Sequence, residues 1–433
     1  MKQLWLEFKS RPLWRKALNI VSALFAIAGM AIIGAWGIYQ LGLTNDRGAA
    51  DQNHRSFLTV AEMESLQGAK LSQERIDEQW ALQYGRLAAL ARYYPENARL
   101  MLAAAQRSGD PLVVDRMLAA ARIYMDQNPA LDSLGDRIEA LLVAAPQRQQ
   151  RNVIPWMDNP EWAVLKQAIL RDSALINRAA DLTGVEARLI VGCLIGEQVR
   201  LFHTDREVLK QYLGPVRTLG VQSQFSYGVN GIKERTAVAV EQHLTDPSSE
   251  YYMGRNFEHL LDYPGGVDQT QERYHRLVDY GNHLYSYLYT GCILHQTMLQ
   301  WRRAGYDISD RPDILFTLFN VGFRQSVPKP NPVAGGSRIT IEGRQYTFGA
   351  IGFDFYYSGE LAEAFPYRRQ RFSQPDHPLT AADIERIQQS ITDCRRPGYH
   401  HEYRRDSTAT SSTGYTPEPP DPFGIDHSRV KPQ

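Results

Sequence analysis

The chain has 433 residues, long enough for about two or three domains, and 43% of them are hydrophobic, as in an ordinary packed globular protein. Its 48 Lys and Arg residues balance 48 Asp and Glu residues, so the formal net charge is zero. This balance argues against a nucleic-acid-binding protein, because such proteins usually carry a strongly basic domain or face.

The N-terminal segment has the pattern of a membrane anchor. Residues 1–16 are rich in Lys and Arg, and residues 17–45 carry no charge. A bilayer core requires about 20 apolar helical residues, whereas a cleaved signal peptide has a shorter apolar core of roughly 7–15 residues. We therefore predict a cytoplasmic N-terminus at 1–16 and an uncleaved transmembrane helix at 17–43. The positive-inside rule then predicts a single-pass protein of the bacterial inner membrane, with its C-terminal domain in the periplasm.

Residues 56–145 are predicted to form a helical juxtamembrane domain, after a polar linker at Asp46–Arg55. They are rich in Ala, Leu, Arg and Glu with helical spacing of the apolar residues, and breaks occur at Tyr94–Asn97 and Gly109–Pro111. We interpret these helices as a stalk or small bundle. A helical repeat that binds envelope protein partners is the alternative.

The second domain is predicted at 160–395, because residues 146–160 are polar and punctuated by prolines. Helical patterning then extends to about residue 325, and Ser337–Phe348 alternates apolar and polar residues around Glu342-Gly343-Arg344, as a β-hairpin does. The predicted fold class is therefore mainly α with a small β-hairpin. A short helix is expected at Thr380–Thr392, and residues 396–433 are predicted to be a disordered tail, because they have little apolar content.

The sequence predicts no metal and no cofactor. No spacing of Cys and His residues typical of zinc ligands is present. Cys193, Cys292 and Cys394 form no CxxC pair, and an exported domain could close one disulfide among them in any pairing.

Glu197 stands at the end of an apolar helical run, three turns after Glu186. A carboxyl group flanked by residues such as Leu194, Ile195 and Val199 is expected to be partly desolvated. Desolvation raises the pKa above that of a free Glu, which is what a general acid near neutral pH requires. The alternative is a helix whose last turn simply surfaces and exposes an ordinary Glu.

Two further motifs follow the helix that ends in Glu197. The second motif is SYGVNGIKERTA at Ser226–Ala237, and the third is LFNVG at Leu318–Gly322. In this order the three motifs resemble the lysozyme-like domain of bacterial lytic transglycosylases of the soluble lytic transglycosylase (SLT) type. In that family an apolar helix ends in the catalytic Glu, a Gly-x-x-Gly-Leu-Met-Gln segment leads to Thr-Ala, and a Tyr-Asn-Ala-Gly turn comes last.

The resemblance covers roughly residues 173–325 and implies a peptidoglycan-cleaving glycosidase, either a lytic transglycosylase or a muramidase. Carried over by position, Glu197 matches the general acid, which acts first as acid and afterwards as base. The family needs no second carboxylate, because the acetamido group of the substrate assists and its 6-hydroxyl closes an anhydro ring; Asp205 and Glu207 are weak candidates for one. The implied substrate-binding residues are Gln198, Tyr227, Gly228, Gly231, Phe319, Asn320 and Gly322.

The chain departs from the family pattern at three places. Gln198 replaces the usual Ser, Lys233-Glu234 stands where the family has Met-Gln, and Phe319 lacks the hydroxyl group of the usual Tyr. A catalytically inactive protein of the same fold, which binds glycan or acts as an envelope scaffold, therefore stays open. Aromatic side chains that could stack on sugars, or pack in the core instead, are Tyr227, Tyr251, Tyr252, Phe319, Phe323, Tyr346, Phe355, Tyr356 and Tyr357.

Overall fold

The computed structural model describes residues 12–40, 48–65, 73–125, 152–202, 226–227, 229–279 and 281–368. The chain divides into two compact units, 1–47 and 48–433. The predicted helix at Thr380–Thr392 and the predicted tail lie outside the described residues. The described residues are mainly helical, as predicted.

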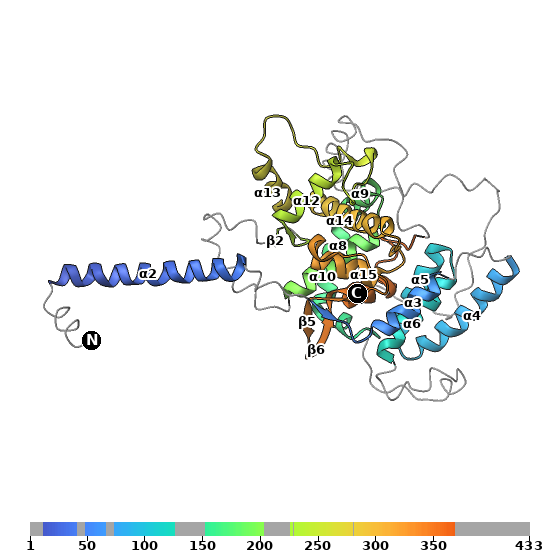
Figure 1. Ribbon diagram of the computed structural model, residues 1–433. Coiled ribbons are helices and arrows are strands. Elements are labelled where there is room, and N and C mark those ends of the chain that lie inside the picture. The colour runs from blue at the N-terminus through green and yellow to red at the C-terminus, as the bar shows by residue number, and fades with distance from the viewer. Residues whose placement is uncertain are drawn as a thin grey trace, which may run out of the picture. The chain divides into compact units, whose positions relative to one another are not determined.

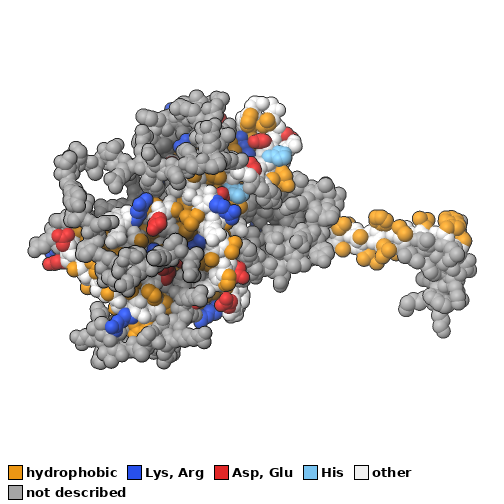
Figure 2. Space-filling model, turned by 180° about the vertical axis from the view of Figure 1, so that it is seen from behind, with side chains coloured by type: hydrophobic (Ala, Val, Ile, Leu, Met, Phe, Trp, Pro, Cys, Tyr) orange, Lys and Arg blue, Asp and Glu red, His pale blue; other side chains and the backbone are white. Residues whose placement is uncertain are grey.

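The first unit contains helix α2 (Leu13–Gln40), which covers most of the predicted transmembrane segment. Its described large apolar side chains, between Trp14 and Ile33, are exposed, and Figure 2 shows hydrophobic side chains along this helix. Among the described residues, no helix combines the length and the apolar character expected of a membrane-crossing helix. The predicted transmembrane helix at 17–43 is thus not identified as such.

The second unit is built mainly from helices, and Figure 1 shows α10, α14 and α15 gathered at its centre. Its first helices are α3 (His54–Ser65), α4 (Gln73–Ala91), α5 (Pro95–Ser108) and α6 (Leu112–Met125). After the short 3-10 helix η3 (Pro155–Met157) come α8 (Pro160–Arg171), α9 (Ser173–Thr183), α10 (Ala187–Phe202), α12 (Glu234–Thr245), η6 (Arg255–Phe257), α13 (Gln269–Val278), α14 (Leu284–Arg303), α15 (Pro312–Val321), η7 (Phe323–Gln325) and α16 (Phe348–Tyr357).

Local sequence signals explain several helix boundaries. Pro95 occupies the first turn of α5, where its missing N–H is not needed, and Gly109 ends that helix in the left-handed conformation at φ 68°. Both predicted breaks, at Tyr94–Asn97 and at Gly109–Pro111, are therefore confirmed. The end of α9 follows the same rule, because Gly184 there has φ 68°.

The described residues of this unit also form three short antiparallel sheets. The predicted hairpin is confirmed: β5 (Arg338–Ile341) pairs with β6 (Arg344–Thr347), and Glu342 and Gly343 turn the chain with φ values of 49° and 79°. Strand β2 (Ser226–Tyr227) pairs with β3 (Ile232–Lys233), and β1 (Ala49–Ala50) pairs with β4 (Gly335–Gly336).

The β1–β4 pair corrects part of the linker prediction. Residues 49 and 50 lie within the predicted polar linker at Asp46–Arg55, but they pair with a segment almost 300 residues away in the sequence, by the register Ala49↔Gly336. The Asp51 N–H extends the contact by donating to the Ala334 carbonyl at 2.8 Å. A strand of two residues has no local alternating pattern, so this pairing could not be predicted from the sequence.

The helices α3 to α6 belong to the same compact unit as the later helices, and they do not form a separate stalk. The ring of Phe57 in α3 lies 4.3 Å from the ring of Phe353 in α16, measured between centroids. Tyr124 of α6 donates its hydroxyl to Asp354 of α16. The predicted domain at 56–145 is therefore joined to the later domain by shared core contacts, because one apolar face of its helices is buried against α16.

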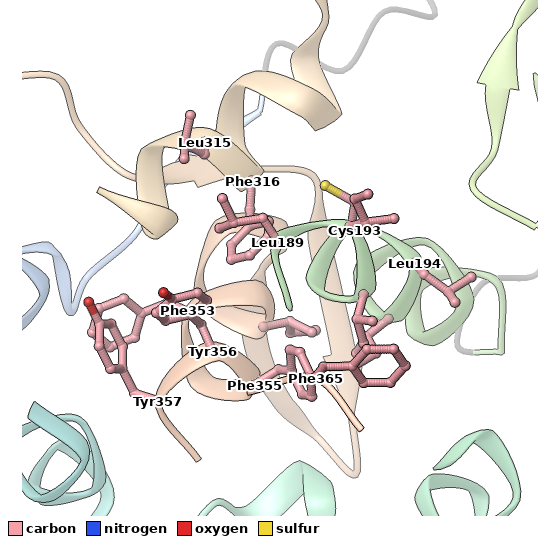
Figure 3. Close-up of a cluster of buried hydrophobic side chains, with 14 of the residues drawn as sticks. Leu189, Cys193, Leu194, Leu315, Phe316, Phe353, Phe355, Tyr356, Tyr357 and Phe365 are labelled. Atoms are coloured by element: carbon pink, nitrogen blue, oxygen red, sulfur yellow. The ribbon is translucent and has the colours of Figure 1, made fainter. Parts of the chain in front are cut away.

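Helix α16 is buried along its whole length. Figure 3 shows Phe353, Phe355, Tyr356 and Tyr357 of α16 clustered with Phe316 of α15 and Leu189 and Cys193 of α10. The aromatic side chains supplied by this helix are buried at the centre of this cluster, where each removes a large apolar surface from water.

Asp354 is a carboxylic acid in this apolar centre, and it is only 1% exposed. It accepts hydrogen bonds from the Tyr124 hydroxyl and from Nε1–H of Trp156, the latter at 2.9 Å. Burial raises the pKa of this carboxyl to about 7, and the charge of Asp51 adds to the shift. The folded protein therefore holds a proton that the unfolded chain, with an Asp pKa of about 3.9, releases.

The Asp354→Asn variant tests this buried proton. A group whose pKa is raised by folding contributes stability that is present below its unfolded pKa and is lost as the pH rises through its folded pKa. We expect the free energy of unfolding of the wild type to fall, relative to that of the variant, between about pH 4 and pH 7. Urea unfolding of both proteins across this range measures the difference. A constant difference at all pH values would show that Asp354 does not titrate there.

Candidate functional site

Helix α10 carries the acidic residue that the sequence analysis singled out. Gly192 and Gly196 lie one turn apart on it, and rings from neighbouring helices rest against these glycines. A Cβ at Gly192 would overlap the ring of Phe316, and a Cβ at Gly196 would lie 2.5 Å from Cζ of Phe348. The two glycines therefore allow aromatic rings to approach the helix backbone immediately before Glu197.

Glu197 is buried and only 4% exposed. The alternative prediction, an ordinary Glu exposed at a surfacing helix end, is therefore wrong. The thiol of Cys193 lies one helical turn earlier. Burial raises its pKa well above the usual value and the charge of Glu197 adds to the shift, so Cys193 is a neutral thiol that behaves as a small hydrophobic side chain.

The turn between β2 and β3 lies directly against the carboxyl group of Glu197. Gly231 in this turn has φ 61°, a left-handed conformation that favours glycine. A Cβ at this position would lie 2.9 Å from Cδ of Glu197 and closer still to Oε2. The second motif is thus brought onto the acid of the first motif, at a distance that only a glycine permits.

Two side chains hold this turn in place. Gln198 donates from Nε2 to the carbonyl oxygen of Val229 at 2.6 Å. Asn230 is fully buried and donates from Nδ2 to Oγ1 of Thr290 in α14 at 2.7 Å. Thr290 in turn donates to the Ser286 carbonyl at 2.8 Å. The turn is therefore attached to α10 on one side and to α14 on the other.

Arg200 forms an ion pair with Glu197 across three residues of α10. The Arg200 side chain is 13% exposed, and its NH2 group donates to Oε2 of Glu197. A guanidinium group beside a buried carboxyl favours the charged form of that carboxyl, whereas burial favours the neutral form. The site therefore combines two opposing effects on one acid.

The third motif reaches this region through Phe348. Oδ1 of Asn320 accepts a hydrogen bond from the Ser337 N–H at 2.8 Å. The rings of Phe319 and Phe348 lie 6.1 Å apart between centroids, and Phe348 rests on Gly196. Gly322 ends α15 with φ 82°. The contacts of the described residues thus connect the third motif to Gly196, the residue before Glu197, by way of Phe348.

Several predicted site residues contribute less to this geometry. Tyr227 pairs with Ile232 through the β2–β3 ladder, and its side chain is not among those described. Gly228, Asp205 and Glu207 lie outside the described residues. Among the aromatic candidates, Phe355, Tyr356 and Tyr357 are at most 1% exposed and Tyr251 and Tyr346 are 7% exposed, so these five pack in the core.

The sequence analysis did not single out three residues that shape the site, namely Arg200, Asn230 and Phe348. Arg200 could have been found, because residues three apart on a helix face each other. Asn230 lies inside the second motif, but no local pattern shows that its amide reaches Thr290. Phe348 begins a helix about 150 residues after Gly196, and only the folded chain brings the two together.

Comparison with protein-family models, curated proteins and solved structures found no match for this chain. The resemblance to the lytic transglycosylases therefore depends on the three motifs and their arrangement. Across the part of the chain that the structure describes, no group of three or more His, Cys, Asp or Glu side chains is arranged to hold a metal ion.

The Gly231→Ala variant tests the close approach of the turn to Glu197. Alanine at position 231 must adopt a left-handed backbone conformation, which costs about 1–2 kcal/mol. Its Cβ must also displace the Glu197 carboxyl, which adds an overpacking cost of about 1–3 kcal/mol. We expect a larger loss in the free energy of unfolding than for Gly305→Ala, measured by urea unfolding.

Gly305 is a matched control. It has φ 89°, and a Cβ there would meet nothing within 4 Å, so its substitution carries the backbone cost alone. Equal losses in the two variants would contradict the contact between Gly231 and Glu197.

Proposed function

We propose that this protein cleaves glycosidic bonds in peptidoglycan, with Glu197 as the single general acid and base. The observation that carries the proposal is the position of Gly231 against the carboxyl group of Glu197. A side chain at this position would collide with the acid and with a sugar bound close to it, whereas a glycine leaves room for both. A lysozyme-like arrangement of α10, α12 and α15 is part of the same proposal.

The proposed reaction has two steps. Protonated Glu197 donates its proton to the glycosidic oxygen as the bond from that oxygen to the anomeric carbon breaks, and the acetamido group of the sugar stabilises the positive charge that develops. Glu197, now a carboxylate, accepts a proton from the attacking hydroxyl. If that hydroxyl is the 6-hydroxyl of the same sugar, the product is an anhydro sugar; if it belongs to water, the product has a reducing end.

The apolar setting of Glu197 supports this role. Glu197 is only 4% exposed, Cys193 lies one helical turn before it, and the ring of Phe348 packs on Gly196, the residue immediately before it. A general acid needs such a setting to hold a proton near neutral pH. Gln198 and Asn230 add rigidity, because they attach the Gly231 turn to two helices.

A second candidate function is favoured by one observation. The ion pair between Arg200 and Glu197 gives the carboxyl a purely structural partner, as a buried acid in a non-catalytic protein would have. Together with the departures at Gln198, Glu234 and Phe319, it supports an inactive glycan-binding or envelope-scaffolding protein. Partner binding through α3 to α6 stays a prediction.

The Glu197→Gln variant distinguishes the two functions. General acid–base catalysis contributes about 10²–10⁴-fold to a rate, so we expect the variant to lose that factor in soluble fragments released from purified peptidoglycan. Mass spectrometry of the fragments then separates the two products, because an anhydro sugar is lighter than a reducing end by one water.

Glu186→Gln is the matched control. Glu186 is also buried, at 1% exposure, and accepts hydrogen bonds from the Tyr356 hydroxyl at 2.8 Å and from the Arg368 N–H at 3.1 Å. Glu186 lies three helical turns from Glu197, too far to contact the proposed acid. A folded Glu186→Gln variant should therefore keep the wild-type activity. Release of fragments by neither the wild type nor the variants, combined with retention on peptidoglycan, would support the binding protein instead.

We also propose that α2 holds the chain at the bacterial inner membrane, with the second unit on the periplasmic side. The support is the exposed apolar side chains of α2 and the basic residues of the segment 1–16. We expect the full-length protein to stay in the membrane fraction after alkaline carbonate washing, and a variant without residues 1–47 to be released. Release of the full-length protein by carbonate would contradict the proposal.

A further inference from the structure

The ion pair at the end of α10 creates a difficulty for the proposed acid. The ion pair with Arg200 favours the charged form of Glu197, whereas a general acid needs the protonated form. The pair is largely buried, with 13% and 6% of the two side chains exposed, so solvent screens it less than a surface pair. Activity therefore requires that the influence of Arg200 on Glu197 be removed when substrate binds.

Arg200 has donors available for another partner. A guanidinium group carries five N–H donors in a planar fork, and the NH2 group of Arg200 is the one bonded to Glu197. Its Nε is buried and makes no hydrogen bond within the described part of the chain. The planar fork fits a carboxylate in two parallel hydrogen bonds, so an incoming anion would compete well for it.

We propose that Arg200 leaves Glu197 for an anionic group of the substrate, and that Glu197 then takes up the proton that it donates in catalysis. This inference depends on the proposed function and specifies its substrate class: a glycan that carries carboxylates, such as the acidic peptide stems of peptidoglycan, rather than a neutral glycan. The proton comes from solvent, and no covalent bond of the substrate changes in this step. Arg200 is then a positioning residue that acts through Glu197.

Titratable groups on the neighbouring helices α9, α14, α15 and α16 have partners away from Glu197. Three of them have partners of their own: His295 of α14 bonds the Thr183 carbonyl at 2.7 Å, Asp313 of α15 pairs with Arg311 at 2.7 Å, and Asp354 of α16 bonds Trp156. On α9, Asp181 pairs with Arg368 at 3.5 Å. Lys233 and Glu234 follow the Gly231 turn and are the charged residues nearest to it in sequence.

The direct test is the number of protons taken up on binding. Calorimetric titration of the full-length protein in two buffers of different ionisation enthalpy measures it, and the probe is a disaccharide–peptide fragment too short to contain the scissile bond. We expect the wild type to take up about one proton near neutral pH. We expect almost none for Glu197→Gln, for Arg200→Met, or for the wild type with a fragment whose carboxylates are amidated.

The pH–rate profile gives a second readout. Loss of a neighbouring Arg moves the titration of a carboxyl by about 1–3 pH units, so Arg200→Met should stay active to a higher pH than the wild type by that amount. Arg200→Lys keeps the positive charge and should restore the wild-type limb of the profile. A merely structural role of Arg200 would lower the rate without moving the profile.

The outcomes separate this inference from the proposed function. If Glu197→Gln cleaves peptidoglycan as fast as the wild type, the proposed function itself is wrong. If Glu197→Gln is inactive but the wild type binds the acidic fragment without proton uptake, only the exchange of Arg200 is wrong. Equal proton uptake by the wild type and Arg200→Met, or failure of the wild type to bind the acidic fragment, also overturns the exchange.

Discussion

The packing of aromatic rings on the glycines of α10 is the contact on which the site depends. Phe316 lies against Gly192 and also against Gly352 of α16, so one ring holds three helices together. Phe348 lies against Gly196 and reaches the segment around Asn320. Any larger residue at these glycines would separate the helices, and well-packed cores do not absorb such changes easily. The position of Glu197 relative to the third motif follows from these ring contacts.

Buried polar groups keep α16 in the orientation that this packing requires. The fully buried guanidinium of Arg188 donates to the carbonyl oxygens of Phe355, Tyr356 and Glu360, each at 2.8 Å. It thereby donates to the carbonyl groups of Phe355 and Tyr356 in the last turn of α16 and of Glu360 beyond it, where the helical hydrogen-bond pattern ends. The aromatic rings of Phe355 and Tyr367 lie 4.5 Å and 4.4 Å from the same guanidinium carbon. Asp354 fixes the middle of the helix to Tyr124 and Trp156.

In the proposed mechanism, helix α10 has both a structural and a chemical role, and the two compete at its last turn. The apolar face of α10 excludes water from Glu197, which favours a protonated acid, and the ion pair with Arg200 favours a carboxylate. Buried ion pairs contribute little net stability, because desolvation offsets the attraction of the charges, and so they are poor reasons to retain two charged residues. The proposed exchange of Arg200 gives the pair a role in controlling the charge of Glu197.

The sequence by itself determined the local structure: Pro95 and Gly109 predicted helix boundaries, Glu342-Gly343 predicted the hairpin turn, and the apolar residues before Glu197 predicted its burial. These features depend on backbone preferences and side-chain spacing within a few residues. Only the tertiary structure decided that the supposed stalk packs on α16, that Ala49 pairs with Gly336, and that Gly231 meets Glu197. These contacts join distant segments, and their formation depends on the complementary shapes of packed surfaces, which no local pattern in the chain records.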